Sequence, residues 1–136
     1  MRVVIDTNVL VSALWSRSGA PARIISQVIN GKLIPCYDYR ILCEYREVLS
    51  RPKFGFTRSE INALLEIFST FGQSVIAEPL ETPFTDESDK KFYEVAKFCH
   101  AVLITGNLKH YPAEPCVMSV SDFLNRSGSL SEWREI

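Results

Sequence analysis

Acidic and amide side chains recur where a strand of this chain is expected to end. Asp6 directly follows the apolar run at residues 3–5, and Asn107 follows the apolar run at residues 101–105. Ligands of open α/β sheets bind outside the carboxyl ends of the strands, so both positions are suited to contact a ligand. Carboxylate and amide oxygens are hard donors. The chemistry that they favour is the binding of Mg²⁺ or Mn²⁺.

Further acids are expected near the same end of the sheet. Asp86 and Asp89 precede the helix that leads into the 101–105 strand, and Glu44 lies on the helix after the second strand, with Glu47 one turn away as the alternative. A cluster of carboxylates without a cation repels itself, so its presence implies a bound cation. The reaction that suits such a cluster is phosphodiester hydrolysis, in which metal ions activate water and stabilise the leaving oxygen.

Each of these residues also has a purely structural explanation. Asp6 is in a position to cap the following helix, and Asp86 and Asp89 suit a first helical turn. Glu44 can pair with a neighbouring arginine at the surface, and Asn107 after Gly106 is a common turn residue. These explanations do not account for the convergence of all the residues on one end of the sheet.

The elements that must position these residues alternate along the chain. Apolar runs predict strands at residues 3–5, 33–37, 74–77, 101–105 and 116–118. Helical spacing predicts helices at 9–15, 22–30, 41–49 and 57–71, from near residue 88, and from about residue 121. Thr57 and Glu60 have the spacing of a capping box. Strands separated by helices imply a parallel sheet covered on both faces. The predicted fold is α/β, a three-layer α/β/α sandwich with a short, mostly parallel central sheet.

Length and composition fit one domain over residues 1–136, with a polar tail from about residue 127. The 136 residues are 46% hydrophobic and 23% charged, as in ordinary globular proteins. The net charge of −1 argues against a protein that coats nucleic acid through a large positive field. It is compatible with a nuclease, because a carboxylate-lined metal site itself uses negative charge.

Several other classes are disfavoured. The four cysteines form no Cys-x-x-Cys pair and there are two histidines, so a zinc site is not expected. Cys36, Cys99 and Cys116 are predicted to be reduced core thiols of a cytoplasmic protein. Asp6 interrupts the N-terminal apolar run, which argues against a signal peptide, and no apolar stretch is long enough for a membrane span. No P-loop or glycine-rich fingerprint occurs, so no nucleotide cofactor is expected.

Three motifs, in this order, resemble the PIN domain family over essentially the whole chain. Residues 4–11 match the first motif, an Asp followed by Thr or Ser and then by Asn, Ser or Cys. Asp86-x-x-Asp89 followed by residues 92–96 matches the third acidic motif, and residues 103–111 match the final motif, a strand followed by Thr-x-Asp. The chain is most similar to the PIN toxins of bacterial and archaeal toxin–antitoxin systems.

The resemblance implies a role for each matching residue. Asp6, Glu44 and Asp89 would be the acidic triad that binds metal, and Asp86 an accessory acid. Three polar residues would hold the carboxylates and bound waters in place: Thr7, Asn8 and Thr105. Asn107 departs from the family, which commonly has Asp there. Its amide oxygen can bind a metal ion or orient a ligated water, but it brings no charge to a second metal ion.

The function implied is that of a Mg²⁺- or Mn²⁺-dependent endoribonuclease, the toxin of a toxin–antitoxin pair. RNA would be the substrate, and a homodimer and an antitoxin protein the partners. The residues predicted to contact phosphate are Arg17, Lys90 and Lys109, with Arg23 and Lys91 as further candidates. The alternative is a catalytically weak or inactive PIN-fold module that binds RNA or protein. A phosphatase is less favoured, because the Asp-x-Asp pair expected there is absent: position 8 is Asn.

Overall fold

The computed structural model describes residues 1–127, and its strands form one five-stranded sheet. The order in space is β3-β2-β1-β4-β5, and every neighbouring pair is parallel. The strands are β1 (Arg2–Ile5), β2 (Ile34–Tyr37), β3 (Gln73–Ser74), β4 (Val102–Ile104) and β5 (Val117–Met118). The predicted parallel sheet is confirmed.

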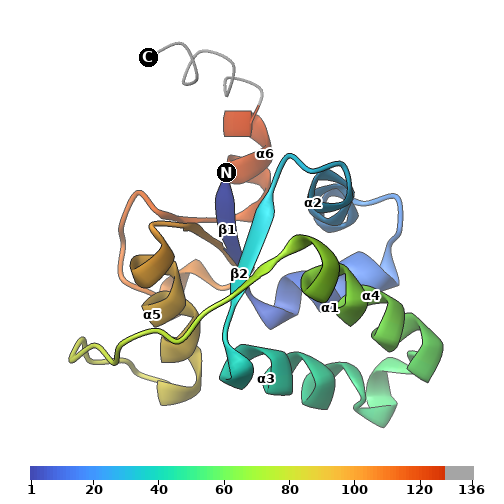
Figure 1. Ribbon diagram of the computed structural model, residues 1–136, viewed down its shortest axis with the longest axis horizontal. Helices are drawn as coiled ribbons and strands as arrows, with labels where there is room; N and C mark the ends of the chain where they lie inside the picture. The colour runs from blue at the N-terminus through green and yellow to red at the C-terminus, as the bar shows by residue number, and fades with distance from the viewer. Residues whose placement is uncertain (128–136) are drawn as a thin grey trace.

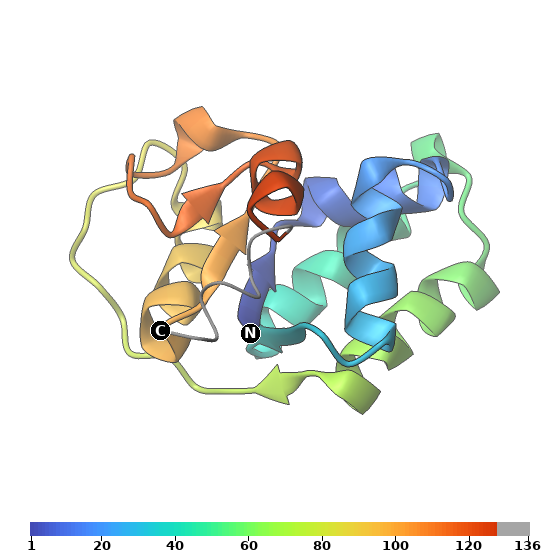
Figure 2. The same ribbon diagram turned by 90° about the horizontal axis from the view of Figure 1, so that it is seen from above.

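Helices cover both faces of this sheet. The α-helices are α1 (Thr7–Trp15), α2 (Ala20–Ile29), α3 (Tyr39–Leu49), α4 (Arg58–Phe71), α5 (Lys90–Cys99) and α6 (Val120–Ser127). Short 3₁₀ turns are η1 (Pro52–Phe54), η2 (Glu87–Asp89) and η3 (Leu108–His110). In Figure 1, α5 lies on one side of β1 and β2, whereas α1, α2 and α4 lie on the other. The view from above shows the same separation, so the α/β/α sandwich is confirmed (Figure 2).

The strand order reverses between β1 and β4. From β1 the chain moves outward to β2 and β3, whereas from β4 it moves to β5 at the opposite edge. Ile5 is in register with Ile104, and the Asp6 N–H donates to the Ile104 carbonyl at 2.9 Å. The residues that follow these strands, Asp6 and Thr105, therefore flank the switch point of the sheet. Open α/β sheets bind their ligands at this point.

Buried aromatic rings join the helices to the central strand. Tyr45 of α3 lies 5.0 Å from Phe68 of α4 and 6.3 Å from Phe92 of α5, measured between ring centroids. The Tyr45 hydroxyl donates to the carbonyl of Ile5, the last residue of β1. This hydrogen bond satisfies a polar group inside the core and fixes α3 beside the carboxyl end of β1. Among the cysteines, Cys36 and Cys99 are buried, as predicted for core thiols, and Cys116 is half buried.

The third strand is shorter than predicted. A strand over 74–77 was expected, but β3 consists of Gln73 and Ser74, which pair with the last two residues of β2. Because β2 ends at Tyr37, the residues after Ser74 have no further residue of β2 to pair with. Residues 75–86 then cross the molecule to reach α5 (Figure 1). The predicted polar tail lies almost wholly outside the described residues, which end at 127.

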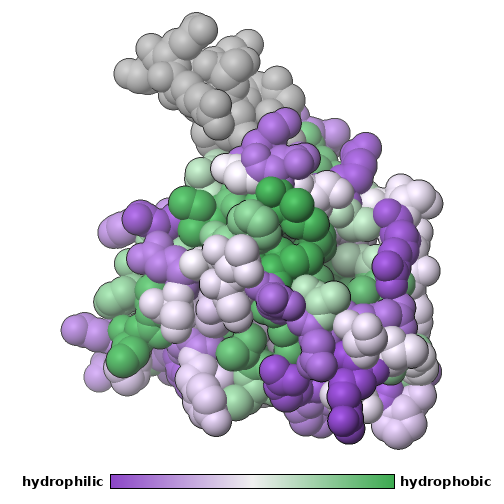
Figure 3. All heavy atoms as spheres, turned by 45° about the vertical axis from the view of Figure 1, so that its right-hand side comes forward, coloured by the Kyte–Doolittle hydropathy of each residue, from purple (hydrophilic) through white to green (hydrophobic). Residues whose placement is uncertain are grey.

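The face formed by α1, α2 and α4 has an apolar hollow of about 380 Å³, lined by side chains such as Leu14, Ile25 and Ile67. Hydrophobic residues gather on the face shown in Figure 3. The ion pair between Arg17 and Glu60, at 2.7 Å, stands at the rim of this hollow. Within residues 1–127, no helix combines the length and the apolar character that crossing a membrane requires.

Candidate active site

Asp6 occupies the centre of the polar cluster at the switch point and is only 5% exposed. One carboxylate oxygen, Oδ1, accepts from the Thr7 N–H at 2.7 Å, so Asp6 does cap α1. The other, Oδ2, accepts from the hydroxyls of Thr105, at 2.8 Å, and Tyr111, at 3.0 Å. The capping role and the site role are therefore compatible, because they use different oxygens.

Burial dominates the ionisation of Asp6. Loss of solvent raises the pKa of Asp6 above its usual value, and the negative charge of Glu44 adds to the rise. Hydrogen bonds from Thr105, Tyr111 and the Thr7 backbone act in the opposite direction, because they stabilise the carboxylate. The pKa of Tyr111 is raised well above its usual range by burial and by the charge of Asp6. The Tyr111 hydroxyl therefore keeps its proton and donates it to Asp6 Oδ2.

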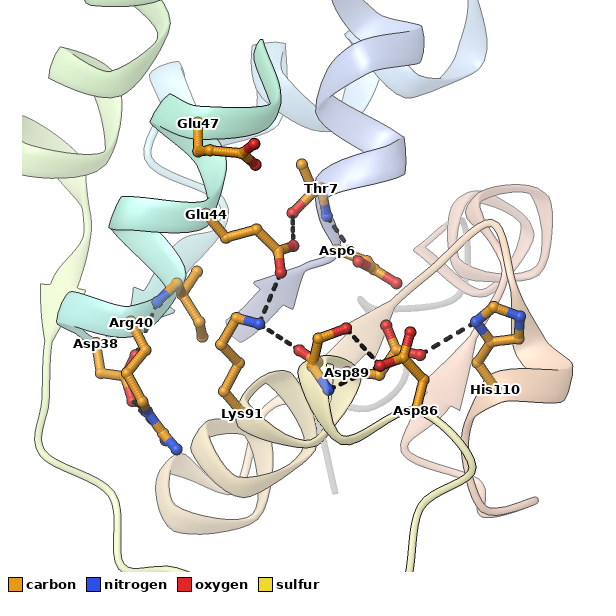
Figure 4. A network of polar contacts seen from close by, with 12 residues as sticks. Asp6, Thr7, Asp38, Arg40, Glu44, Glu47, Asp86, Asp89, Lys91 and His110 are labelled. Carbon is orange, nitrogen blue, oxygen red and sulfur yellow. Dashed lines mark hydrogen bonds and ion pairs between the residues drawn. The ribbon is translucent and has the colours of Figure 1, made fainter. Parts of the chain in front are cut away.

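Glu44 reaches the cluster from α3. Its Oε2 accepts from the Thr7 hydroxyl, and its Oε1 lies 2.6 Å from Nζ of Lys91 on α5 (Figure 4). Glu47, one turn further along α3, instead forms an exposed ion pair with Arg51 at 3.0 Å. Of the two glutamates considered from the sequence, Glu44 is the one whose carboxylate joins the network around Asp6.

The two aspartates that precede α5 differ in environment. Asp89 is partly buried, and its Oδ2 lies 3.1 Å from Nδ1 of His110. Burial raises the pKa of Asp89, and the charges of Asp6 and Asp86 raise it further. Asp86 is exposed and caps η2, accepting from the N–H and hydroxyl of Ser88 at 2.9 and 2.7 Å, which lowers the pKa of Asp86. Of the two aspartates, Asp89 is therefore the one whose pKa is raised by the charge of Asp6.

The amide side chain of Asn8 ties the loop after β4 to the start of α1. Asn8 donates to Asp6 Oδ2 at 3.3 Å and accepts from the Gly106 N–H at 2.9 Å. A Cβ atom at Gly106 would lie 3.1 Å from Asn8 Oδ1, so the close approach favours glycine here. The Asn107 N–H donates to the Thr105 hydroxyl at 2.9 Å, and the residue stands exposed at the rim.

The basic residues predicted to contact phosphate are not all near the carboxylates. Lys91 reaches Glu44 directly, and Lys90 begins the same helix, with Nζ 4.0 Å from Glu87. Lys109 is exposed on η3, beside the loop after β4. Arg17 lies beyond the far end of α1, paired with Glu60, and Arg23 is exposed on α2. The structure therefore does not bring these two arginines to the carboxylates.

The donor atoms fit a hard cation, but they are not gathered into a finished metal site. Among residues 1–127, no three His, Cys, Asp or Glu side chains stand close enough together to hold a metal ion. Glu44 is held by Lys91 and Asp89 by His110. Burial is the main cause of the raised pKa values of Asp6 and Asp89, and neighbouring carboxylates add to it; a divalent cation would favour the charged form of both groups.

Sequence reasoning did not identify three contacts of this cluster. These are the hydroxyl of Tyr111 on Asp6, the imidazole of His110 beside Asp89, and the pairing of Lys91 with Glu44. Tyr111 and His110 stand within the last motif, which was the available signal. Lys91 was considered only as a possible phosphate contact, because nothing in its spacing connects it to Glu44.

Comparison with known proteins gives two matches. A family model described as PIN domain matches residues 2–109. The chain is also 36% identical over 111 residues to the uncharacterized protein MJ1680 of Methanocaldococcus jannaschii, an alignment that covers 79% of this chain and 71% of that protein. The span matched by the family model includes Asp6, Glu44, Asp89 and Asn107.

Proposed function

Because the chain belongs to the PIN domain family, whose members are in general nucleases, we propose that it is a Mg²⁺- or Mn²⁺-dependent endoribonuclease. The observation that carries the proposal is the buried Asp6 at the switch point of the sheet, with Glu44 bonded to the adjacent Thr7 hydroxyl and with Asp89 near enough for the charge of Asp6 to raise the pKa of Asp89. Buried carboxylates that repel one another are unfavourable unless a cation joins them.

The residues have separate tasks in this proposal. Asp6, Glu44 and Asp89 would hold the cation, with the Asn107 amide oxygen as a neutral ligand and Asp86 as an accessory acid. When bound, a divalent cation polarises the phosphodiester and supplies a nucleophilic water at neutral pH. Thr105 and Tyr111 keep Asp6 oriented by donating to Oδ2, and Thr7 does the same for Glu44. Asn8 locks the loop that carries Asn107.

The resemblance supports a finer proposal for the biological role. We propose the toxin of a toxin–antitoxin pair, acting on RNA in the cytoplasm, with an antitoxin protein and a second copy of the chain as partners. Lys90 and Lys109 are the proposed phosphate contacts near the carboxylates. The alternative is a PIN-fold module that binds RNA or protein without efficient cleavage. Asn107 favours it, because an amide brings no charge to a second metal ion.

A cleavage assay with matched variants separates these functions. Fluorescently labelled single-stranded RNA is incubated with Mn²⁺ and with the wild type, Asp6→Asn, Glu44→Gln or Glu47→Gln. We expect Asp6→Asn and Glu44→Gln to lose at least about 100-fold in rate, since loss of even an outer hydrogen-bond partner of a metal site costs about 10–100-fold. Glu47→Gln, the control on the same helix, should cleave normally. Wild-type RNA binding without cleavage in any divalent metal would favour the binding module.

A thermal readout tests the metal site independently of activity. Mn²⁺ should raise the melting temperature of the wild type, because a ligand that binds only the folded state stabilises it. Asp6→Asn should remove that rise while keeping the helix cap, since asparagine caps as well as aspartate. An unchanged Mn²⁺ effect in Asp6→Asn would contradict the assignment of Asp6 as a ligand.

A further inference from the structure

An aromatic surface stands at the far end of α1. Trp15, its last residue, is 63% exposed, although large aromatic side chains are usually buried. Its ring lies 5.3 Å from Phe54 and 6.3 Å from Phe56, and those two phenylalanines stack at 5.8 Å. Neighbouring aromatic rings hold Trp15 in place while leaving most of it in solvent. An exposed, fixed aromatic face is suited to stacking against a flat partner.

Positive charge surrounds these rings. Phe56 lines a hollow of about 520 Å³ together with Arg46 and Arg58, both of which are exposed. Segment 46–60 carries four basic residues, Arg46, Arg51, Lys53 and Arg58, and two acidic ones, Glu47 and Glu60. Both acids are already paired, with Arg51 and Arg17 respectively. This region is thus locally positive in a chain whose net charge is −1.

Helices α1 and α3 connect this surface with the proposed active site, which lies at the other end of α1. Helix α1 runs from Thr7, beside Asp6, to Trp15, and a rise of 1.5 Å per residue makes that distance about 12 Å. Helix α3 carries both Glu44 and Arg46 and packs alongside α1 (Figure 1). At a stacked spacing of about 3.4 Å per nucleotide, roughly three to four nucleotides of one strand cover this length.

We propose that Trp15, Phe54, Phe56, Arg46 and Arg58 form a binding surface for single-stranded RNA that leads into the active site. The proposal rests on the ribonuclease function proposed above. Unpaired bases stack on the indole of Trp15, and the guanidinium groups of Arg46 and Arg58 contact phosphates, so recognition is largely independent of sequence. A second copy of the chain fits less well, because a self-complementary contact would bring two copies of the same positively charged surface together, whereas RNA supplies negative charge.

The test uses binding without cleavage. The chain has two tryptophans, so a Trp133→Phe background leaves Trp15 as the reporter. In EDTA, a 12-nucleotide oligouridylate should quench Trp15 fluorescence. By fluorescence anisotropy with labelled oligouridylate, Trp15→Ala should bind about five-fold more weakly or worse, and Trp15→Phe should retain most of the affinity. Arg58→Gln should also make the slope of log affinity against log salt shallower by about 0.7.

The matched control is Lys32→Gln, which removes an exposed positive charge just before the amino end of β2, away from the carboxyl ends of the strands. It should leave RNA affinity and salt slope nearly unchanged. Equal affinity for the wild type, Trp15→Ala and Arg58→Gln would overturn the proposal. So would sedimentation data in which Trp15→Ala dissociates a dimer without altering RNA affinity. Trp15-dependent binding without any metal-dependent cleavage would leave this surface standing and refute only the nuclease proposal.

Discussion

At the scale of single residues, Lys91 gives the carboxylate cluster a positive charge of its own. Its ammonium lies 2.6 Å from Glu44 Oε1, donates to the Ser88 carbonyl and stands 5.2 Å from the centroid of the Phe92 ring. The side chain is 13% exposed, so the charge is poorly screened by water. The positive charge of Lys91 therefore stabilises the metal-free protein and weakens the binding of a metal ion beside Glu44.

Replacing this lysine should move stability and metal affinity in opposite directions. Lys91→Met should lower the stability of the metal-free protein by roughly 1–2 kcal/mol, because Glu44 loses a charge-assisted hydrogen bond. The same change should strengthen Mn²⁺ binding about tenfold or more, since a nearby positive charge is removed. Thermal unfolding and Mn²⁺ calorimetry measure the two effects. The control is Lys97→Met on the same helix, which removes a lysine paired with Glu114 and not with Glu44. Equal Mn²⁺ affinity in wild type and Lys91→Met would refute this account.

The raised pKa of Asp6 predicts that the stability of the metal-free protein depends on pH. Because burial raises that pKa in the folded state above 3.8, folded Asp6 binds more protons than unfolded Asp6. Its contribution to stability is therefore complete below about pH 3.8 and is lost as the pH rises through the raised pKa. Without metal, the melting temperature of Asp6→Asn relative to wild type should increase between about pH 3.5 and about pH 7.

Asp86→Asn is the control with the opposite sign. Hydrogen bonds from Ser88 lower the pKa of Asp86, so its stabilisation is present above pH 3.8 and lost as the pH falls through the lowered value. Relative to wild type, Asp86→Asn should become less stable as the pH rises from the lowered pKa to about 3.8, and its relative stability should then stay nearly level. Circular dichroism melts at several pH values distinguish the two variants. Parallel pH profiles for both would contradict the electrostatic assignment.

At the scale of elements, the turn after α5 holds the two ends of the candidate site together. Helix α5 begins directly after Asp89, and it ends at His100, which has a φ of 52° in the left-handed region. The Ala101 N–H reaches back to the Ala96 carbonyl at 2.9 Å, as in a Schellman motif. This tight end directs the chain straight into β4, which carries Thr105 to Asp6.

A glycine should suit that turn better than the native residue. His100→Gly should stabilise the protein by about 0.5–1 kcal/mol, because relief of left-handed strain outweighs the added flexibility of the unfolded chain. His100→Ala should give no such gain, since alanine keeps the Cβ atom. Urea unfolding at constant pH measures both. A His100→Gly variant less stable than wild type would show that the imidazole makes a contribution greater than the backbone strain.

Local signals were enough to predict most elements. The capping box of Thr57 and Glu60 forms as predicted, with hydrogen bonds of 3.1 and 2.9 Å, because its chemistry is complete within four residues. The β-branched run before Asp6 likewise predicted a buried strand. The length of β3 could not be predicted, because it depends on how far its partner β2 extends.

The candidate site could be predicted only in part, because some of its contacts join segments that lie far apart in the sequence. Asp6 and Asp89 follow from motifs, whereas no motif separates Glu44 from Glu47, and the structure places the Glu44 carboxylate in the network; the roles of all three stay predictions. Of the two hydroxyls that orient Asp6 from distant segments, Thr105 was predicted from its match to the last motif, whereas the contact of Tyr111, 105 residues beyond Asp6, was not. No periodicity or spacing in the sequence encodes a contact across that separation.

At the scale of the whole molecule, one buried ion network links the two helical layers. The Glu94 carboxylate of α5, 4% exposed, binds Arg40 of α3 at 2.8 Å and accepts from the Leu80 N–H at 2.7 Å. Arg40 also binds Asp38, the residue that caps α3, at 2.7 Å. Helix α3, helix α5 and the long crossing segment are thereby joined by one carboxylate.

Neutralising that carboxylate should weaken the whole fold. Glu94→Gln should lower the unfolding free energy by about 1–3 kcal/mol, because a buried charge-assisted hydrogen bond is lost while Asp38 and Arg40 remain. Glu114→Gln, which removes a more exposed pair with Lys97, should cost less than about 1 kcal/mol. Denaturant unfolding measures both variants. An equal loss of unfolding free energy in Glu94→Gln and Glu114→Gln would show that the network stabilises the protein no more than an ordinary surface ion pair does.

The strand order β3-β2-β1-β4-β5 also has a consequence for the nascent chain during synthesis. Synthesis proceeds from the N-terminus, and β1 reaches its partner β4 only after nearly a hundred further residues have been added. A nascent chain that ends at Cys99 already contains Asp6, Glu44 and Asp89, yet it lacks the β4 backbone and the hydroxyls of Thr105 and Tyr111 that orient Asp6. Under the ribonuclease function proposed above, such a chain would leave the messenger that encodes it uncut until β4 and the segment up to Tyr111 have been synthesised.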